Sequence, residues 1–423
     1  MPKMNRLYLL PFLLAFYLPA TAAVSNDELN LLKNELMNLI HRVELLEAEN
    51  KKLQESAQAT NARAATEAKA QEVPSTPIAR TNEWTDSISL KGDFRHRYEN
   101  IHSEVLDSRE RSRLRARFAL TAHPADNLEI GIGVASGGDD PVSTNQTLGA
   151  GDSTKDLGLD LAYFKWNAKP GFTVIGGKMK NVWRRPGGNG LVWDGDLRPE
   201  GLAFIYSRGD FFLNTGFNFL ESDSSKNNSS ISYGVQTGIN RPINTGHLLV
   251  GASYFEMGTA NREVFFGDPD EFFGNSSSCT NATDLQGCTY NNDYEELELF
   301  AQWATKLGER PLILFADYVR NMDVDNLDTA WAAGLKYGEA RNPRTWEISY
   351  TYQNLEADAV FGLLTDSDFA GGGTDSRGHI VKGDWAINKQ WKIGVTYFDT
   401  ERNIDKGTEE AYRRLILDTA FKF

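Results

Sequence analysis

The chain has 423 residues, of which 40% are hydrophobic and 24% charged, and its 44 lysines and arginines against 58 acidic residues give a formal net charge of −14. Such an acidic balance argues against nucleic acid as a partner, because phosphate binding requires a basic surface. Beyond the N-terminal region the sequence contains no apolar run of about 18 residues, which excludes a helical membrane protein.

The first 23 residues have the features of a secretory signal peptide. Lys3 and Arg6 precede an apolar run over 7–18, and small residues follow over 19–23. A membrane anchor is the alternative, but this run is shorter than the about 20 residues that span a bilayer. We therefore expect residues 1–23 to direct export and to be cleaved.

A heptad pattern follows the signal peptide. Its apolar positions are spaced alternately by three and four residues, with a single asparagine among them: Leu29, Leu32, Leu36, Leu39, Val43, Leu46, Asn50 and Leu53. This pattern predicts a coiled-coil oligomerisation stalk over 24–55, in which the asparagine fixes register and partner number. The alternative is an amphipathic helix that packs on its own domain. Residues 56–83, rich in Ala, Gln, Thr and Pro, resemble a flexible linker.

The remainder, 84–423, reads as a series of β-strands. Apolar residues alternate with small or polar ones, as in Leu128, Ile130, Ile132 and Val134 against Glu129, Gly131 and Gly133. Sixteen candidate strands have this character: 87–99, 109–121, 128–136, 157–168, 171–181, 201–208, 211–221, 230–240, 247–258, 295–306, 311–321, 329–338, 344–355, 378–388, 390–400 and 412–423. Such alternation is typical of strands with lipid on one face and water on the other.

The connections between these strands alternate between short and long. The short ones include 123–127, 169–171, 208–210 and 388–390, and the long ones 137–156, 182–200, 259–294 and 356–377. A transmembrane barrel has this arrangement, with short turns in the periplasm and long loops outside. We therefore predict an all-β fold, a 16-stranded antiparallel transmembrane barrel in contact with outer-membrane lipid. Both barrel termini then lie on the periplasmic side, as the stalk requires.

The second predicted strand carries arginine at every other position, at Arg109, Arg111, Arg113, Arg115 and Arg117, which we call the arginine ladder. Arginines on a lipid-facing surface would each cost about 2–4 kcal/mol near the bilayer midplane, so the ladder should face the lumen. Arg95 and Arg97 of the first strand share that face in the predicted phase. Guanidinium groups bind carboxylate or phosphate, and a series of shallow sites suits conduction.

The alternative is that the ladder only stiffens the wall by pairing with lumen carboxylates. The expected partners are Asp93, Glu129, Glu296, Glu298, Glu347 and Asp384. The predicted inward positions hold more basic than acidic residues, however, so we expect part of the ladder to remain in excess.

The long loop over 182–200 combines aromatic residues, Gly, Pro and charge. Arg184, Arg185 and Arg198, set against Asp194 and Asp196, predict a loop that folds inward and places a transverse field across the pore. An ordinary surface loop is the alternative.

The only two cysteines, Cys279 and Cys288, lie in one long loop of an exported chain, which predicts a disulfide. No histidine lies near them, so a metal pair is disfavoured. The six histidines of the chain are scattered and accompany no nucleophile or metal spacing. We expect neither a catalytic site nor a bound metal or cofactor.

The terminal strand 412–423 ends on Phe423, which resembles the assembly signal of bacterial outer-membrane barrels. Together with the signal peptide, heptads, linker, strand pattern and arginine ladder, it makes the chain similar in layout to the putative-porin family of Gram-negative outer membranes. In layout it also resembles trimeric dicarboxylate- and phosphate-selective porins with an N-terminal coiled coil. The resemblance implies a homotrimeric channel for small hydrophilic solutes, with small anions favoured and the coiled coil in the periplasm.

Two other functions stay open on the sequence. The acidic loops favour an unselective or weakly cation-selective porin if they outweigh the ladder. Alternatively, the stalk makes contact with peptidoglycan, and the protein is a structural tether between outer membrane and cell wall.

Overall fold

The structure is a computed structural model and describes residues 87–423, apart from 223–224, 226–227 and 282–283. The predicted signal peptide, coiled-coil stalk and linker lie outside these residues. Among the described residues, no helix is long and apolar enough to cross a membrane.

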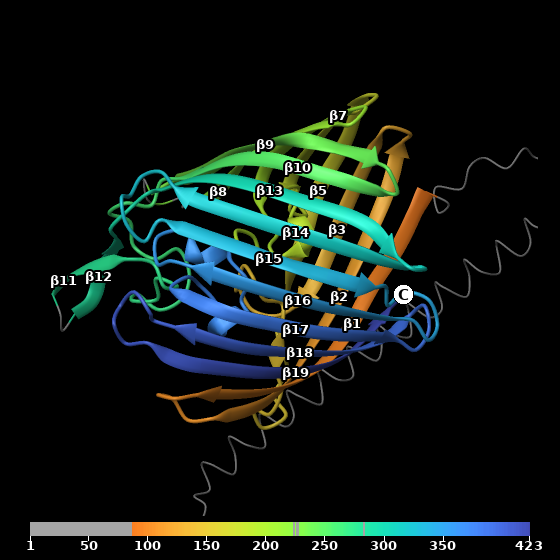
Figure 1. Ribbon diagram of the computed structural model, residues 1–423. Helices are drawn as coiled ribbons and strands as arrows, with labels where there is room; N and C mark the ends of the chain where they lie inside the picture. Colours follow the sequence, from red (N-terminus) through yellow and green to blue (C-terminus); the bar gives the residue numbers. More distant parts are fainter. Residues whose placement is uncertain (1–86, 223–224, 226–227, 282–283) are drawn as a thin grey trace, which may run out of the picture. The chain divides into compact units, whose positions relative to one another are not determined.

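Seventeen antiparallel strands form one sheet, and all of them except the two-residue strand β4 close into a sixteen-stranded barrel (Figure 1). Strand β1 pairs with β2 on one side and with the last strand, β19, on the other, so the barrel has no free edge. The predicted fold class and strand number are confirmed for this part of the chain.

The barrel strands are β1 (Ile88–Ser103), β2 (Arg109–Ala125), β3 (Leu128–Ser136), β5 (Leu157–Lys169), β6 (Phe172–Lys178), β7 (Glu200–Arg208), β8 (Phe211–Glu221), β9 (Ser230–Ile243), β10 (Gly246–Met257), β13 (Tyr294–Leu307), β14 (Arg310–Asn321), β15 (Thr329–Gly338), β16 (Trp346–Leu355), β17 (Ser376–Ala386), β18 (Trp391–Arg402) and β19 (Glu410–Lys422). The connections contain β4 (Gln146–Thr147), the hairpin β11 (Ser277–Asn281) and β12 (Asp284–Tyr290), and the 3₁₀ helices η2 (Pro186–Gly188), η3 (Gly362–Leu364) and η4 (Phe369–Gly371).

The predicted strand bounds differ from the observed ones mainly at the ends. Neither the extension of β1 to Ser103 nor the early end of β6 at Lys178 has a signal in the residue pattern. The turn expected over 123–127 is only Asp126 and Asn127, because β2 continues through Pro124 to Ala125. Strand β4 and the hairpin β11–β12 lie inside long connections and were not predicted.

All the long connections leave the same end of the barrel. The longest are the β3–β5 loop (137–156), the β6–β7 loop (179–199), the β10–β13 loop (258–293) and the β16–β17 loop (356–375). The short turns lie at the opposite end, where the chain also terminates (Figure 1). This segregation agrees with the predicted alternation of short and long connections and separates a loop end from a turn end.

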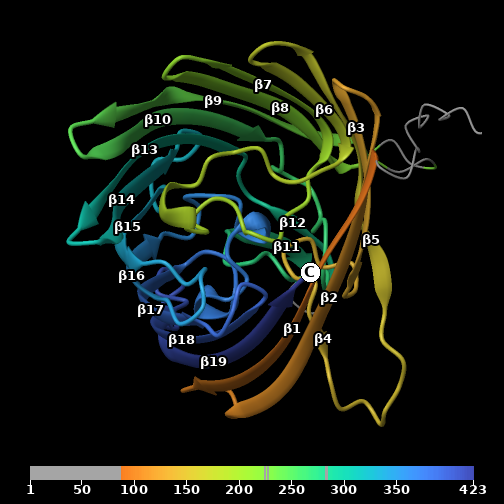
Figure 2. The ribbon, with the colours of Figure 1, turned by 90° about the vertical axis from the view of Figure 1, so that its right-hand side faces the viewer.

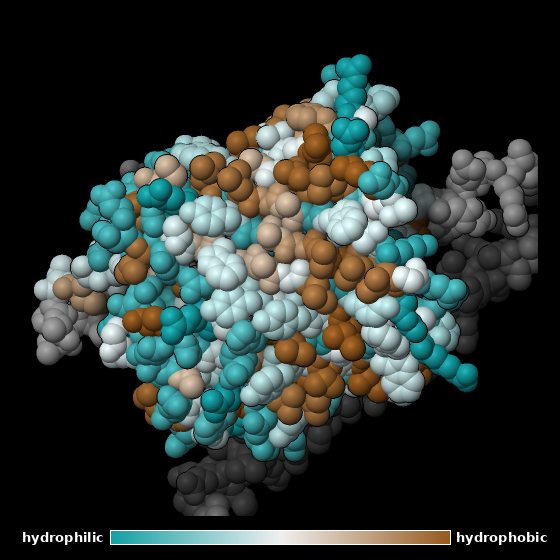
Figure 3. Space-filling view, in the orientation of Figure 1, coloured by the Kyte–Doolittle hydropathy of each residue, from teal (hydrophilic) through white to brown (hydrophobic). Residues whose placement is uncertain are grey.

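The two faces of each strand differ as the alternation predicts. On β8 the side chains of Phe217 and Phe219 are exposed on the outside, whereas Phe212 and Asn214 are buried inside. On the face shown in Figure 3, hydrophobic and aromatic side chains cover the middle of the outer surface, and hydrophilic ones gather toward its ends. An apolar outer band is what a lipid-facing barrel requires.

The last residue closes the barrel at the turn end. Phe423 exchanges two backbone hydrogen bonds with Gly92 of β1, at 2.9 and 3.1 Å, and its ring packs on Phe118. A Cβ atom at residue 92 would lie 2.4 Å from the Phe423 ring, so only glycine allows this contact. Trp391 and Phe421 stack beside it, with ring centroids 5.3 Å apart, in the aromatic girdle typical of membrane barrels.

Candidate functional site

Strand register brings the arginine ladder face to face with β1. In the β1–β2 pairing Arg95 is opposite Arg115 and Arg97 is opposite Arg113. Like charges directly opposite each other on a sheet are destabilising. Carboxylates must therefore separate these arginines, and they come from β1 itself, from β19 and from two inward loops.

The first of these carboxylates is Glu99, which lies on β1 itself in phase with Arg95 and Arg97. Its side chain is completely buried and pairs with Arg111 of the ladder. It also accepts a 2.8 Å hydrogen bond from Arg414 of β19. A fully buried carboxylate between guanidinium groups holds β1, β2 and β19 together, because either charge alone would be costly to bury.

The next two carboxylates come from the neighbouring strand β19 and from the β16–β17 loop. Asp418 of β19 accepts a two-pronged bond from Arg97, at 2.8 and 2.9 Å. Asp368, from the loop, lies 2.7 Å from Arg97 and 2.9 Å from Arg414. Burial alone would raise the pKa of Asp368, but Arg414 and Arg97 lower it below the ordinary value. The loop is therefore held inside the barrel by an ionised carboxylate.

The lower part of the ladder is paired with Asp93 and with Asp196 of the β6–β7 loop. Arg115 lies 3.0 Å from both carboxylates, and Arg117 lies 2.8 Å from both. Burial would raise the pKa of Asp196, yet the neighbouring arginines, Arg115 first among them, lower it. A second loop is thus fixed directly to the ladder.

These contacts form one cluster, the arginine wall, in which guanidinium groups outnumber carboxylates by seven to five. Its members are Arg95, Arg97, Arg111, Arg113, Arg115, Arg117 and Arg414, with Asp93, Glu99, Asp196, Asp368 and Asp418. Arg109, at the loop end of the ladder, is exposed and forms no ion pair with a described residue. Extensive pairing and a positive excess therefore coexist in the wall.

Most carboxylates expected as ladder partners lie elsewhere. Only Asp93 pairs with the ladder, and Asp384 pairs instead with Lys382 and Lys392 at 3.4 and 3.0 Å. Glu296 and Glu298 are buried on β13 without a cation partner among the described residues. Among the observed ladder partners, Asp196 comes from an inward loop, which strand periodicity does not reveal.

The β6–β7 loop folds into the barrel, as the sequence predicts for the loop over 182–200 (Figure 2). It crosses to the wall opposite the ladder, where the backbone N–H of Gly187 donates to Gln302, at 2.7 Å, and Asn189 donates to Asp317, at 2.9 Å. Gly187 has φ +60°, and a Cβ atom there would lie 2.2 Å from the Phe315 ring. Glycine thus lets the loop approach the strand closely.

The side chain of Gln236 anchors the start of this loop by two bonds to the backbone of Arg184, at 2.7 and 3.0 Å. Trp183 and Trp193 pack edge-on against Phe255 of β10, with ring centroids 5.0 Å apart in both pairs. The loop is therefore part of the barrel interior and narrows it.

The three arginines of this loop make different contacts from those expected. Arg184 lies over the ring of Phe212, 4.2 Å from its centroid. Arg185 donates to the carbonyl of Trp193 at 2.9 Å, and Arg198 lies 3.4 Å from Asp160 of β5. Of the two aspartates expected opposite these arginines, Asp196 pairs instead with Arg115 and Arg117 of the ladder.

A second inward loop, β16–β17, was not expected from the sequence. It meets the β6–β7 loop in a junction where the backbone N–H of Asp194 donates to Leu364, at 2.8 Å, and that of Ser367 donates to the Asp194 carboxyl, at 3.0 Å. The backbone N–H of Asp366 bonds to the carbonyl of Gly190, at 3.1 Å. The two loops therefore constrict the lumen together.

The junction brings together two carboxyl groups, the buried Asp194 and the half-buried Asp366. Burial, and then the charge of Asp366, raise the pKa of Asp194 to about 8. Burial, and then Asp368, raise the pKa of Asp366 to about 6. Near neutral pH, Asp194 is thus predominantly protonated and contributes little negative charge to the constriction.

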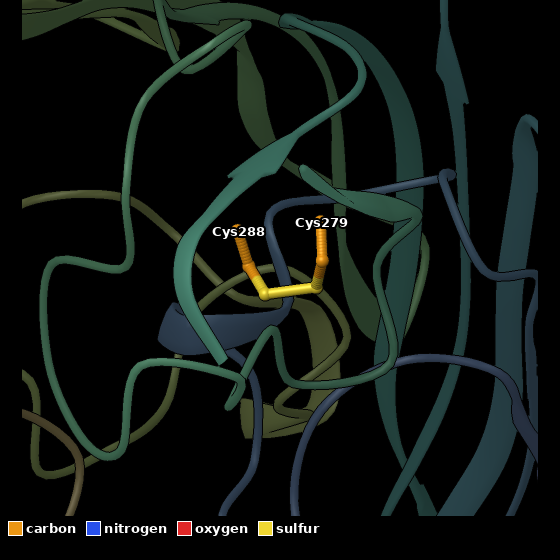
Figure 4. Close-up of a disulfide and its surroundings, with 2 residues drawn as sticks. All are labelled: Cys279 and Cys288. Carbon is orange, nitrogen blue, oxygen red and sulfur yellow. A yellow bond between two sulfur atoms is a disulfide. The ribbon is translucent and has the colours of Figure 1, made fainter. Parts of the chain in front are cut away.

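The β10–β13 loop lies over the loop end of the barrel. A disulfide joins Cys279 and Cys288 across its hairpin (Figure 4). Deeper in the loop, Asn275 donates to the carbonyls of Ala357 and Val360, at 2.8 and 2.9 Å. Through these hydrogen bonds, the β10–β13 loop holds the β16–β17 loop in place.

Comparison with known proteins agrees with the fold. No curated protein matches the sequence. In fold the chain is similar to OprB of Pseudomonas putida, solved at high pH, with 12% identity, a TM-score of 0.55 and coverage of 82% of this chain and 96% of that one. It is also similar to OmpF of Salmonella typhi in complex with daunomycin, with 12% identity, a TM-score of 0.50 and coverage of 81% and 99%.

A family described as Putative porin matches residues 102–261 and 268–423. These ranges include most of the barrel, the arginine ladder and both inward loops. The chain therefore belongs to the Putative porin family and has the closed barrel fold of outer-membrane porins.

Proposed function

We propose that the protein is a passive diffusion channel of the bacterial outer membrane that admits small hydrophilic solutes and favours anions such as carboxylates or phosphate. The observation that carries the proposal is the excess of guanidinium groups over carboxylates in the arginine wall. Asp194, with its pKa raised to about 8, does not offset that excess near neutral pH. A positive constriction lowers the barrier for anions and raises it for cations.

The N-terminal stalk completes the proposal. Residues 24–55 associate as a periplasmic coiled coil and make the channel a homotrimer, and residues 56–83 connect the stalk to the barrel. The support is the heptad pattern with its single asparagine. Contact of the stalk with peptidoglycan is compatible with this arrangement.

One observation favours a second candidate, a weakly cation-selective porin. A cavity of about 610 Å³ lies between the β3–β5 and β6–β7 loops. Its charged lining is mostly acidic: Asp139, Asp140, Asp156, Asp160, Asp196 and Glu200, against Lys178 and Arg198. If solutes cross here, they meet mostly carboxylates beside the arginine wall.

Uptake into proteoliposomes separates these functions with three polyols of similar size, gluconate, sorbitol and N-methylglucamine, which are anionic, neutral and cationic. We expect gluconate to enter several-fold faster than sorbitol, and N-methylglucamine to enter most slowly. The reverse order would support the cation-selective candidate. Uptake of none of the three by folded protein would favour a structural tether.

A further inference from the structure

A small cavity opens at the loop end of the arginine ladder, beside the β16–β17 loop. Its volume is about 200 Å³. Four arginines line it, Arg109, Arg111 and Arg113 from β2 and Arg414 from β19. An anion that approaches from the loop end meets these side chains before Arg115 and Arg117, because Arg109 is the first residue of β2.

Two of these guanidinium groups have a hydrogen-bond donor without an acceptor. The Nε–H groups of Arg113 and Arg414 are buried and have no hydrogen-bond acceptor among the described residues, although the Arg414 side chain is only 1% exposed. Buried donors normally have an acceptor, and leaving one unpaired costs free energy. An acceptor brought by a ligand would satisfy them.

Arg113 is the least committed arginine of the wall. It lies 3.6 Å from Glu99, 3.4 Å from the Ser143 hydroxyl and 3.5 Å from the Asn145 carbonyl. Charge-assisted bonds between guanidinium and carboxylate are usually about 2.7–2.9 Å long. The guanidinium group of Arg113 is therefore available for a shorter hydrogen bond to an incoming anion.

The rest of the lining is partly apolar. Phe273, Leu363, Val142 and Tyr412 contribute to the wall of the cavity, and Ser143 and Ser367 add hydroxyl groups. The single acidic residue in the lining is Asp140, and burial raises its pKa, which reduces the charge that would oppose an anion. The site thus combines guanidinium groups with an apolar surface in a small volume.

From these features we infer that the cavity is a capture site for a small organic anion, whose carboxylate binds Arg113 and Arg414 while its apolar part lies against Leu363 and Phe273. This inference rests on the proposed anion channel and adds the place and the chemistry of the first binding step. Inorganic phosphate fits the arginines but gains nothing from the apolar surface.

Benzoate is the probe, and its neutral analogue benzamide and inorganic phosphate are the references. In planar bilayers we expect benzoate to block the Cl⁻ current of the full chain in a saturable manner, at a lower concentration than phosphate, and benzamide not to block. Arg113→Gln should raise the half-blocking concentration about tenfold, the effect of losing one charge-assisted bond. Arg109→Gln, an exposed position without an ion pair to disturb, should raise it by less.

Arg413→Gln is the matched control, because Arg413 neighbours Arg414 in sequence but lies on the outer face, paired with Asp399. It should leave block by benzoate unchanged. Equal block by benzoate and benzamide, block unaffected by both ladder variants, or equal potency of phosphate would overturn the inference. The Cl⁻ preference of the unblocked channel is read in the same recordings. Its loss would reject the proposed function instead.

Discussion

Replacing Glu99 by glutamine should destabilise the barrel by about 3–5 kcal/mol, the usual effect of removing one partner from a buried ion pair. Glu99 is completely buried and bonds to Arg111 and Arg414, which come from the two strands on either side of β1. Without its charge, these guanidinium groups face Arg97 and Arg113 with less compensation. The measurement is the urea midpoint of unfolding in detergent micelles, followed by tryptophan fluorescence.

Glu401→Gln provides the control for this variant. Glu401 also pairs with an arginine, Arg377, at 2.7 Å, but both side chains are more than a third exposed, and such surface pairs contribute at most about 1 kcal/mol. A Glu99→Gln barrel as stable as Glu401→Gln would show that the arginine wall does not hold β1 to its neighbours.

Raising the pH from 5 to 9 should loosen the junction between the β6–β7 and β16–β17 loops and enlarge the conductance. The folded pKa of Asp194, about 8, and that of Asp366, about 6, both exceed the ordinary value of 3.8. The stability that these groups give to the docked loops is fully present below the ordinary pKa, at pH about 4. It is lost as the pH rises through the raised pKa values of the folded state. Between pH 6 and 8, release of one proton changes the ratio of docked to undocked loops by up to about tenfold per pH unit.

Asp194→Asn tests this mechanism, because asparagine cannot ionise and keeps one of the two oxygens that accept backbone bonds from Asp196 and Ser367. Its single-channel conductance should vary little over the range in which that of the wild type rises. The other charged groups around the junction, Arg185, Asp196 and Asp368, are unchanged in the variant. Conductance of the wild type that is constant from pH 5 to 9, or that falls, would contradict the assignment.

The arginine ladder was predictable because its signal is local. A period of two places Arg109 to Arg117 on one face, and the cost of charge in lipid decides which face. Glu99 shares the same period with Arg95 and Arg97 and was still missed, although phase alone could have identified it. The inward fold of the β6–β7 loop was predictable from its glycines, proline and aromatic residues.

The partners from the β16–β17 loop were not predictable in this way. Asp368 pairs with Arg97 across 271 residues of sequence, and the surrounding segment has no periodicity that distinguishes it from an exposed acidic loop. The same holds for Asp194 and Asp366, whose raised pKa values arise only because two distant loops bury them together. Contacts between loops that are distant in the sequence have no local sequence signal.

The most direct test of an anion-selective channel is the zero-current potential of the reconstituted protein under a KCl gradient. We expect the sign that Cl⁻ preference produces, and a potential close to zero or reversed for the variant with Arg111, Arg113 and Arg115 changed to Gln. Its control changes the outward-facing Arg320, Arg377 and Arg413 to Gln and should behave as the wild type. A wild-type potential with the sign of K⁺ preference would contradict the account.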